Sequence, residues 1–162
     1  MENIDIEIEN ESSIFKLRVN GILINNNKVL CVQMMNNGFF CLPGGHIEIG
    51  EDSINAVIRE IKEETNIDTK VIKLISITEN FFTRKNGKKV HELSFYYLLE
   101  PKSKLTLKKD EYNIVEIDKN QQIEHHFKWV NIDNLEEEDF RPIEIRNKMK
   151  EQKFDFEQII IK

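Results

Sequence analysis

The stretch LPGGHIEIGEDSINAVIREIKEETNI, residues 42–67, constrains the fold more than any other part of this chain. Within it, four apolar residues recur at the i, i+3, i+4, i+7 spacing of one helix side: Ile54, Val57, Ile58 and Ile61. Asp52 and Ser53 precede this run, and both residue types cap helices by accepting hydrogen bonds from free backbone N–H groups. The sequence therefore predicts a helix over residues 52–65 with one side buried.

Three carboxylates, Glu60, Glu63 and Glu64, share a neighbouring face near the end of this helix. Like charges at this spacing repel by roughly 0.2–0.5 kcal/mol per pair, and the helix dipole disfavours negative charge there. Most acidic runs are solvated faces, but those usually include several cations, whereas here Lys62 points elsewhere on the helix and Arg59 stands alone. A divalent cation would offset the repulsion, since Mg²⁺ prefers a few carboxylates, water and substrate phosphates.

Two glycines, Gly44 and Gly45, precede the helix and follow Pro43. Glycine adopts conformations closed to other residues and lets a ligand approach the backbone closely. A free carbonyl group here can supply another oxygen to a metal ion. A Gly-Gly pair by itself usually marks only a turn, so its spacing to the three glutamates is what makes it informative.

The same residues match a known signature. Gly45 is followed by five residues and Glu51, and then by seven residues and the run Arg59-Glu60-Ile61-Lys62-Glu63-Glu64. This pattern resembles the Nudix box of the Nudix hydrolase family. Asn66 stands where the signature has its final glycine, and asparagine is the next best residue for a left-handed helix cap. We expect no effect of this departure on the chemistry.

The resemblance implies an α/β fold: a Nudix-type α/β/α sandwich with a mixed β-sheet, built by residues 1–162 as one domain. It implies hydrolysis, dependent on Mg²⁺ or Mn²⁺, of a nucleoside diphosphate linked to another group. Nucleoside triphosphates, ADP-ribose and nucleotide sugars are such compounds. Metal ions screen the charge of the diphosphate, position a water molecule in line and lower its pKa. The expected partner is thus a small nucleotide-like diphosphate.

Carried over residue by residue, the match assigns the metal ligands to three glutamates and one backbone carbonyl: Glu60, Glu63, Glu64 and Gly45. One of these glutamates is expected to assist the attacking water. Arg59 is expected to orient glutamates, above all Glu51, rather than to touch the phosphates. Many members take a further glutamate from a later loop, for which Glu124 is the candidate and Glu111 and Glu116 are rivals. A plain surface position explains Glu124 equally well.

Composition limits the partners further. The net charge of −6 and pI near 5.3 argue against binding a nucleic-acid polymer, which favours a basic face. No apolar run approaches the length of a membrane span, and the N-terminus lacks a signal-peptide pattern, so we expect a cytoplasmic protein. Cys31 and Cys41 are expected to be reduced, buried thiols. Residues 4–10 alternate as an edge strand does, which leaves a homodimer open.

Strand signals dominate the rest of the chain. Two strong strands meet at Asn86-Gly87, a hairpin signal, and the basic residues around this turn favour solubility over phosphate steering. Residues 101–122 fit a loop, a lid or a weak hairpin. A strand around Trp129, a helix after Pro142 and a last strand over residues 155–162 complete the prediction.

Several other side chains fit either a structural or a functional role. His46 fits a turn residue or a phosphate contact. Adjacent strand residues face opposite sides, so His125 and His126 are not expected to share a metal, and one of His91 and Glu92 is expected to face the cleft. Five aromatic residues are expected to be mostly core, with one or two left for nucleobase stacking: Phe81, Phe82, Phe95, Tyr96 and Tyr97.

Two other functions fit the signature less well. A silent Nudix-like domain would sense a nucleotide, but such domains commonly lose box glutamates or carry a DNA-binding domain. A Nudix-fold isomerase of isoprenoid diphosphates would need a cysteine and a glutamate in its pocket, and Cys41 lies near the box. The box recognises only the diphosphate and metals, so the substrate depends on segments 83–89 and 101–127, which show no recognisable pattern.

Overall fold

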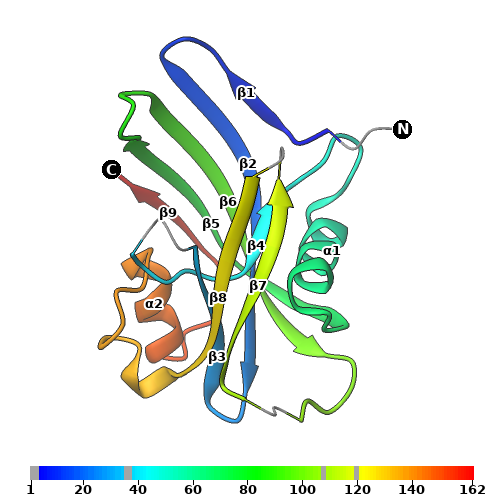
Figure 1. The fold of residues 1–162 in the computed structure, drawn as a ribbon. Coiled ribbons are helices and arrows are strands. Elements are labelled where there is room, and N and C mark those ends of the chain that lie inside the picture. Colours follow the sequence, from blue (N-terminus) through cyan, green and yellow to red (C-terminus); the bar gives the residue numbers. More distant parts are fainter. Residues whose placement is uncertain (1–3, 35–37, 107–108, 119–120) are drawn as a thin grey trace.

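The computed structural model describes residues 4–34, 38–106, 109–118 and 121–162, and the side chains of residues 116–118 and 121 lie outside this description. Within these residues, four strands precede the first α-helix, four more follow it, and a second α-helix and a last strand end the chain (Figure 1). The elements are β1 (Glu7–Glu9), β2 (Ser13–Asn25), β3 (Lys28–Met34), β4 (Gly44–His46), α1 (Ser53–Thr65), β5 (Thr69–Thr83), β6 (Lys89–Pro101), β7 (Glu111–Asp118), β8 (Gln121–Asn131), the 3-10 helix η1 (Ile132–Asn134), α2 (Ile143–Lys150) and β9 (Glu157–Ile161).

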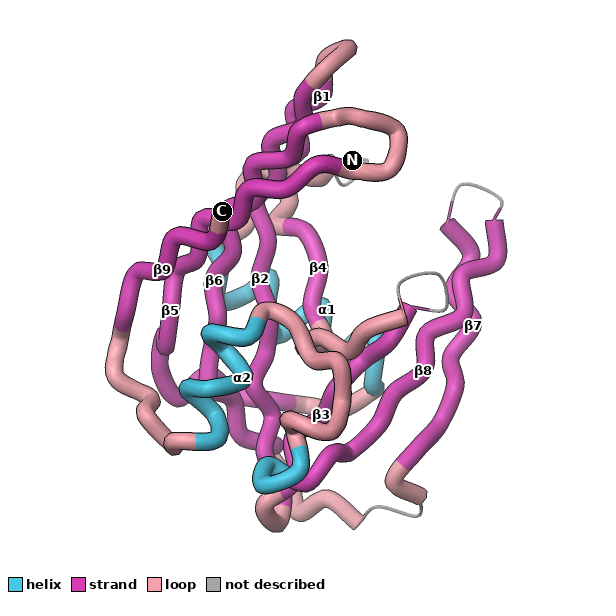
Figure 2. Tube along the Cα trace, turned by 90° about the vertical axis from the view of Figure 1, so that its left-hand side faces the viewer, coloured by secondary structure: helices cyan, strands magenta, loops and turns pink. Residues whose placement is uncertain are grey.

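A mixed sheet joins the strands in the order β7–β8–β3–β2–β6–β5–β9, and β1 and β4 also pair with β2. The pairs β2–β6 and β5–β9 are parallel, whereas the others are antiparallel. Figure 2 shows β7 and β8 standing apart from the half of the sheet that holds β2, β6, β5 and β9. β2 connects the two halves because its C-terminal end pairs with β3.

The two helices lie on opposite sides of the strands (Figure 1). Ile61 of α1 belongs to one buried apolar cluster and Ile145 of α2 to another. Side chains alternate along a strand, so β2 supplies both clusters, with Leu23 on the α1 side and Ile22 on the α2 side. The fold is therefore the α/β/α sandwich with a mixed sheet that the resemblance implies.

The buried side of α1 differs from the prediction. Ile54 is 48% exposed, whereas Ala56 is fully buried beside Val57 and Ile61. Residues four apart share one side of a helix, so the contact of Glu60 with β4, described below, buries Ala56 as well. The apolar spacing predicted the helix correctly but not its rotation about its own axis.

The structure decides two points that the sequence left open in the later strands. Residues 101–122 were open between loop, lid and hairpin, and their second half forms β7, which pairs with β8. Phe81 and Phe82, expected to be mostly core, are 39% and 41% exposed, unlike the buried Tyr96 and Tyr97. Phe81 and Phe82 lie near the turn of the long β5–β6 hairpin, beyond the part of the sheet that the helices cover (Figure 1).

The two cysteines are free thiols, as expected. Cys31 is fully buried as expected, whereas Cys41 is only partly buried. The Cys41 thiol donates a hydrogen bond of 3.6 Å to the carbonyl oxygen of Val32. Burial raises the pKa of Cys41 to about 11, so little of it is the reactive thiolate at neutral pH. In the part of the chain that the structure describes, no helix has both the length and the apolar character to cross a membrane.

Both ends of α1 carry the caps that the sequence predicts. The Asp52 carboxylate accepts hydrogen bonds from the backbone N–H groups of Ile54 (3.0 Å) and Asn55 (2.9 Å). At the other end Asn66 adopts the left-handed conformation, with φ 57° and ψ 19°, and donates its N–H to the Lys62 carbonyl. Asparagine tolerates this conformation better than most residues, and glycine adopts it without strain.

The cap at residue 66 gives a stability prediction. Asn66→Ala should lower the free energy of unfolding by about 1 kcal/mol, because alanine is strained in the left-handed region. Asn66→Gly should leave it unchanged or raise it by less than about 1 kcal/mol, since relief of strain is offset by greater unfolded-state entropy. Urea denaturation of both variants measures the difference, and an alanine variant as stable as the glycine variant would contradict this account.

Candidate functional site

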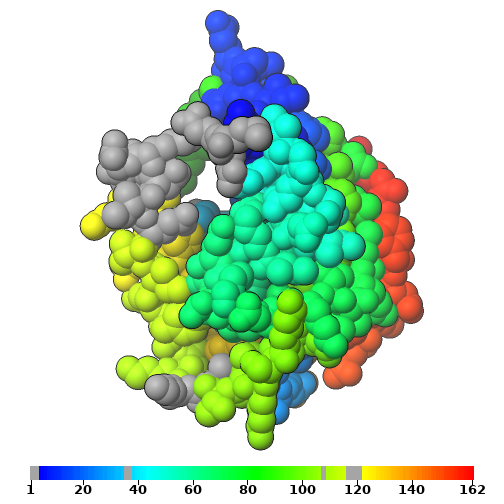
Figure 3. All heavy atoms as spheres, turned by 90° about the vertical axis from the view of Figure 1, so that its right-hand side faces the viewer, coloured from blue at the N-terminus to red at the C-terminus, as the bar shows by residue number. Residues whose placement is uncertain are grey.

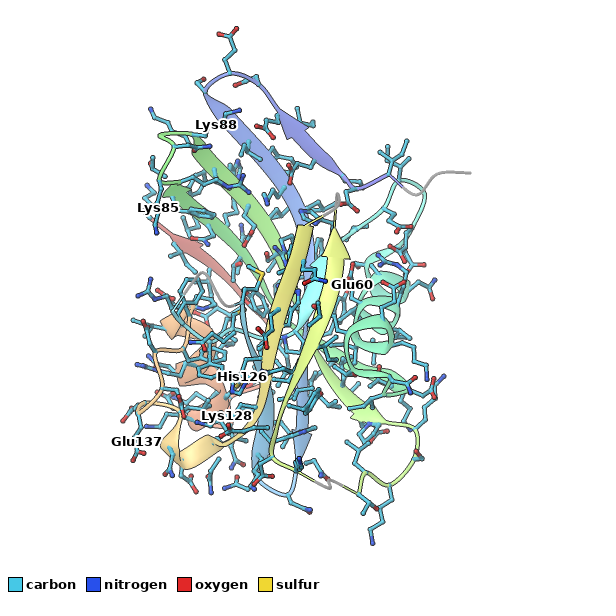
Figure 4. The ribbon with its side chains drawn as sticks, viewed as in Figure 1. Glu60, Lys85, Lys88, His126, Lys128 and Glu137 are labelled. Atoms are coloured by element: carbon cyan, nitrogen blue, oxygen red, sulfur yellow. The ribbon has the colours of Figure 1, made fainter. Side chains whose placement is uncertain are left out.

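β4 is the surface against which the acidic side of α1 packs. Gly45 of this strand lies opposite Val19 of β2. Glu60 projects from α1 toward the strands (Figure 4). A Cβ atom added at Gly45 would lie 2.3 Å from the Cδ atom of Glu60. The Glu60 carboxylate therefore rests directly on the backbone of Gly45, and any other residue at position 45 would displace it.

Gly44 has a separate role. Its backbone N–H donates a hydrogen bond of 3.0 Å to the Oε2 atom of Glu64. Its φ is 151°, and an added Cβ atom would lie 2.1 Å from the carbonyl oxygen of Val19. Because glycine alone fits here, the chain can pass close to β2 and present this N–H group to the helix.

Arg59 is the centre of the acidic cluster. Its Nε and Nη2 atoms each donate a 2.8 Å hydrogen bond to Glu51, forming a two-pronged pair. Its Nη1 atom donates to Glu60 at 2.9 Å and to Glu63 at 3.2 Å, and Nη2 also donates to the His46 carbonyl at 3.0 Å. The carboxylate of Glu48 lies 3.9 Å away. The predicted contact between Arg59 and Glu51 is thus present.

Protonation differs between the acids around Arg59. Hydrogen bonds from Arg59 hold the pKa of Glu51 below its usual range. Burial raises the pKa of Glu60, although Arg59 acts in the opposite direction. Glu63 remains 60% exposed. Glu51 is therefore a fixed anion, whereas the charge on the buried Glu60 costs free energy that another nearby cation would reduce.

Two groups from other strands lie beside this cluster. Arg18 of β2 donates a hydrogen bond of 3.2 Å from Nη2 to the Gly44 carbonyl. Burial, and next the charge of Glu64, raise the pKa of Tyr112 on β7 to about 12, so its hydroxyl stays protonated at neutral pH. Figure 3 shows the surface hollowed between the segment of β4 and α1, cyan to green, and the yellow β7–β8 hairpin. Neither Arg18 nor Tyr112 belongs to a motif by which the sequence could have pointed to this site.

Comparison with known protein families matches the NUDIX domain to residues 15–150. The chain belongs to the Nudix family. Its signature residues are the ones gathered around Arg59 and β4. The division into one domain over residues 1–162 stays a prediction, since the matched region ends short of both termini.

Several curated proteins are similar to part of this Nudix chain. An ADP-ribose pyrophosphatase of Methanocaldococcus jannaschii is 39% identical over 85 residues, covering 51% of this chain and 48% of that protein. Nudix hydrolase 10 of Arabidopsis thaliana is 33% identical over 96 residues, covering 54% of this chain and 31% of that protein. The matches thus span about half or less of these relatives, so their activities are not transferred here.

Solved structures support the fold. An ADP-ribose pyrophosphatase from Streptococcus suis superposes with a TM-score of 0.57 at 19% identity, covering 90% of this chain and 98% of that one. A UDP-X diphosphatase superposes with a TM-score of 0.60 at 17% identity, covering 94% of this chain and 69% of that one. At such identities the likeness concerns the Nudix fold alone.

The candidates for a glutamate beyond the Nudix box are not joined to the Arg59 cluster. Glu124 accepts a hydrogen bond of 2.8 Å from Asn113, the one partner it has among the described residues. It lies on the same side of β8 as His126, whereas Phe127 faces the α1 cluster. Glu111 lies near His126, at 3.7 Å. The side chain of Glu116 is outside the described residues, so these assignments stay predictions.

The histidines have structural partners. His46 contacts Glu7 at 3.3 Å with its Nε2 atom, while its carbonyl supports Arg59. His125 is buried whereas His126 bonds to Asn113, so the two point apart as expected. His91 stacks on Phe81 at 4.3 Å between ring centroids, and Trp129 is core.

The donor set of the Nudix site fits a hard divalent cation. Its side chains offer carboxylate oxygens, which Mg²⁺ and Mn²⁺ prefer, and the acids outnumber the cations around Glu60. Across the described residues, no three His, Cys, Asp or Glu side chains already converge as a formed metal centre. The carboxylates instead contact Arg59 and Gly44. The residues that would hold the ion are Glu60, Glu63, Glu64 and the carbonyl of Gly45.

The two glycines should respond differently to substitution. Gly44→Ala should lower the free energy of unfolding by roughly 2–4 kcal/mol, because the added methyl group meets backbone atoms at a strained φ. Gly45→Ala should lower it by less than about 1 kcal/mol, because the Glu60 carboxylate is the end of a flexible side chain and can move away. Urea denaturation of the two variants tests this, and equal losses would refute the distinction.

The opposite pKa shifts of Glu51 and Glu60 predict opposite pH effects in metal-free buffer with EDTA. The pKa of Glu51 is lowered in the folded state, so its contribution is present above about 4.5 and is lost as the pH falls through the folded value. Glu51→Gln should therefore cost about 1–3 kcal/mol at neutral pH and little in acid.

For Glu60 the sign is reversed. Its folded pKa is raised, so the native state is favoured below about 4.5 and loses that advantage as the pH rises through the folded value. Glu60→Gln should consequently cost less at neutral pH than Glu51→Gln. Denaturant titrations at several pH values measure both curves. A larger loss for Glu60→Gln at neutral pH would show that the hydrogen bond to Arg59 outweighs burial.

Proposed function

We propose that this chain is a pyrophosphohydrolase that cleaves the diphosphate bond of a nucleoside diphosphate linked to another group. The observation that carries the proposal is the cluster of carboxylates around Arg59, packed on the glycines of β4. The name of the relative from Methanocaldococcus jannaschii makes ADP-ribose the first substrate to test. Nucleoside triphosphates and nucleotide sugars share the same diphosphate chemistry.

The proposed roles follow from the contacts. Glu60, Glu63 and Glu64, with the Gly45 carbonyl, hold Mg²⁺ or Mn²⁺. A divalent cation supplies positive charge against the diphosphate and lowers the pKa of water near it. Arg59 and Glu51 hold the glutamates in place without touching the phosphates, because the guanidinium is already occupied by protein acceptors.

The proton of the attacking water needs an acceptor. Glu63 is mostly exposed, and among the described residues it accepts one hydrogen bond, of 3.2 Å from Arg59, so it can turn toward a water molecule. Glu64 is held by the Gly44 N–H and lies close to β7. Both are candidates for this role, together with Glu124 if the β7–β8 hairpin approaches a bound substrate.

The alternatives have less support. A silent nucleotide sensor would not need the complete set of box glutamates that this chain retains. An isomerase would need a reactive cysteine, but the Cys41 thiol donates to a backbone carbonyl and its pKa is raised to about 11. A thiol in this state is a poor acid or base at neutral pH.

The decisive experiment measures product formation from ADP-ribose, nucleoside triphosphates, nucleotide sugars and dinucleoside polyphosphates with Mg²⁺ or Mn²⁺. Turnover of at least one class should vanish with EDTA and fall at least about 100-fold in Glu64→Gln and Glu63→Gln, because the ligand charge is lost while the shape is kept. Glu137→Gln is the matched control, since Glu137 is an exposed residue far from Glu60 in Figure 4.

Two results would contradict parts of this proposal. Turnover that persists in EDTA would exclude the proposed use of metal. Binding of nucleotides without turnover of any compound, in a folded protein with bound Mn²⁺, would favour the sensor.

A further inference from the structure

The guanidinium of Arg59 has no donor left for a substrate. An arginine side chain carries five N–H groups, and five hydrogen bonds leave this one, toward three carboxylates and one carbonyl. Releasing any of them would expose a glutamate charge to its neighbours. A substrate phosphate at this site therefore needs a different cation from the protein.

Among the described residues, Arg18 is a cation beside this site that has free donors. Its hydrogen bond to the Gly44 carbonyl, 3.2 Å from Nη2, is the one bond it forms among the described residues. Within the same residues no carboxylate lies within 4.0 Å of it, although the chain has an excess of acids. Lys16, two residues earlier on the same side of β2, is already paired with Glu7 at 3.3 Å.

Arg18 lies beside the acidic cluster. It pairs with His46 of β4 on one side of β2 and with Ser94 of β6 on the other. The carbonyl that it contacts belongs to Gly44, whose N–H holds Glu64. Its charge also reaches Glu60, where it acts to lower the pKa. One residue, Gly44, thus separates Arg18 from a glutamate of the Nudix box.

The neighbours of Arg18 across the sheet are short. Ser94 and, beyond it, Thr78 occupy the next positions of β6 and β5, and both are buried. Small hydroxyl side chains beside a half-buried guanidinium favour its interaction with an outside anion over burial against the protein. The basic tip of the β5–β6 hairpin cannot take this role, since Lys85 and Lys88 lie far from Glu60 in Figure 4.

We propose that Arg18 binds the non-bridging oxygens of the substrate's diphosphate. This inference rests on the proposed function, and it adds a binding residue from β2 that lies outside the Nudix box. The planar guanidinium presents two parallel N–H donors that match a phosphate, whereas a lysine presents a single charged point. Charge on these oxygens is part of the phosphoryl-transfer transition state, so the same contact assists turnover.

Binding of methylenebisphosphonate, a diphosphate analogue that cannot be hydrolysed at its bridge, tests the contact without turnover. Calorimetry in Mg²⁺ should show at least 10-fold weaker binding to Arg18→Gln and an intermediate loss for Arg18→Lys. Arg84→Gln, which removes an exposed arginine from the β5–β6 hairpin, is the matched control and should bind as the unchanged protein does. With the substrate found in the panel, kcat/KM of Arg18→Gln should fall at least as much as bisphosphonate affinity.

A purely structural role of Arg18, holding Gly44 and through it Glu64, predicts something different. In that case Mn²⁺ binding without ligand, measured by electron paramagnetic resonance, would weaken in parallel with bisphosphonate binding. If Arg18 instead contacts the phosphates, the affinity of Arg18→Gln for Mn²⁺ should stay within about twofold of that of the unchanged protein. Parallel losses of both affinities would overturn the proposal.

The two proposals fail in different ways. Unchanged bisphosphonate affinity and unchanged kcat/KM in Arg18→Gln would refute the role of Arg18 and leave hydrolysis standing. No binding of the bisphosphonate to the unchanged protein, together with no turnover of any compound, would refute both.

Discussion

The pairing of Arg59 with Glu51 is the interaction on which the rest of the site depends. It joins α1 to the loop that follows β4 through two short hydrogen bonds in a partly buried place. With this anchor in place, the remaining donors of Arg59 reach Glu60, Glu63 and the His46 carbonyl. Without it, several carboxylates at the end of a helix would repel one another with no cation between them.

The cluster around Arg59 carries more negative than positive charge. Burial of Glu60 against Gly45 raises the pKa of a carboxyl that the proposed chemistry needs as an anion. A site of this kind lowers the stability of the free protein and binds a cation more strongly as a result, because the cation removes the unfavourable charge. Glycine at position 45 permits the Glu60 carboxylate to approach the backbone closely. The same residue therefore determines both the local packing and the charge of the site.

Sequence alone predicted the parts of the site that are local. The helix and its two caps follow from spacings within one stretch, and the Arg59–Glu51 contact was implied by the resemblance of that stretch to the Nudix box. The rotation of α1 was not predictable in this way, because Glu60 meets β4 only after β4 has paired with β2. Phe81 and Phe82 carry a strand pattern, but how far a hairpin extends past its helices depends on the whole fold. The role of Arg18 was not predictable for the same reason, since Arg18 contacts Gly44 only because β2 pairs with β4, which is distant in the sequence.

The residues proposed for the chemistry come from one stretch of the chain, whereas those proposed for specificity come from distant strands. One continuous stretch, from β4 to the end of α1, supplies all the proposed metal ligands. The groups around it come from elsewhere: Arg18 from β2 and Tyr112 from β7, in opposite halves of the sheet. Their distance from each other is set by the pairing of β2 with β3, which connects those halves. Substitutions that shift the β7–β8 hairpin relative to β2 would therefore change which substrate is accepted while leaving the carboxylate cluster around Arg59 intact.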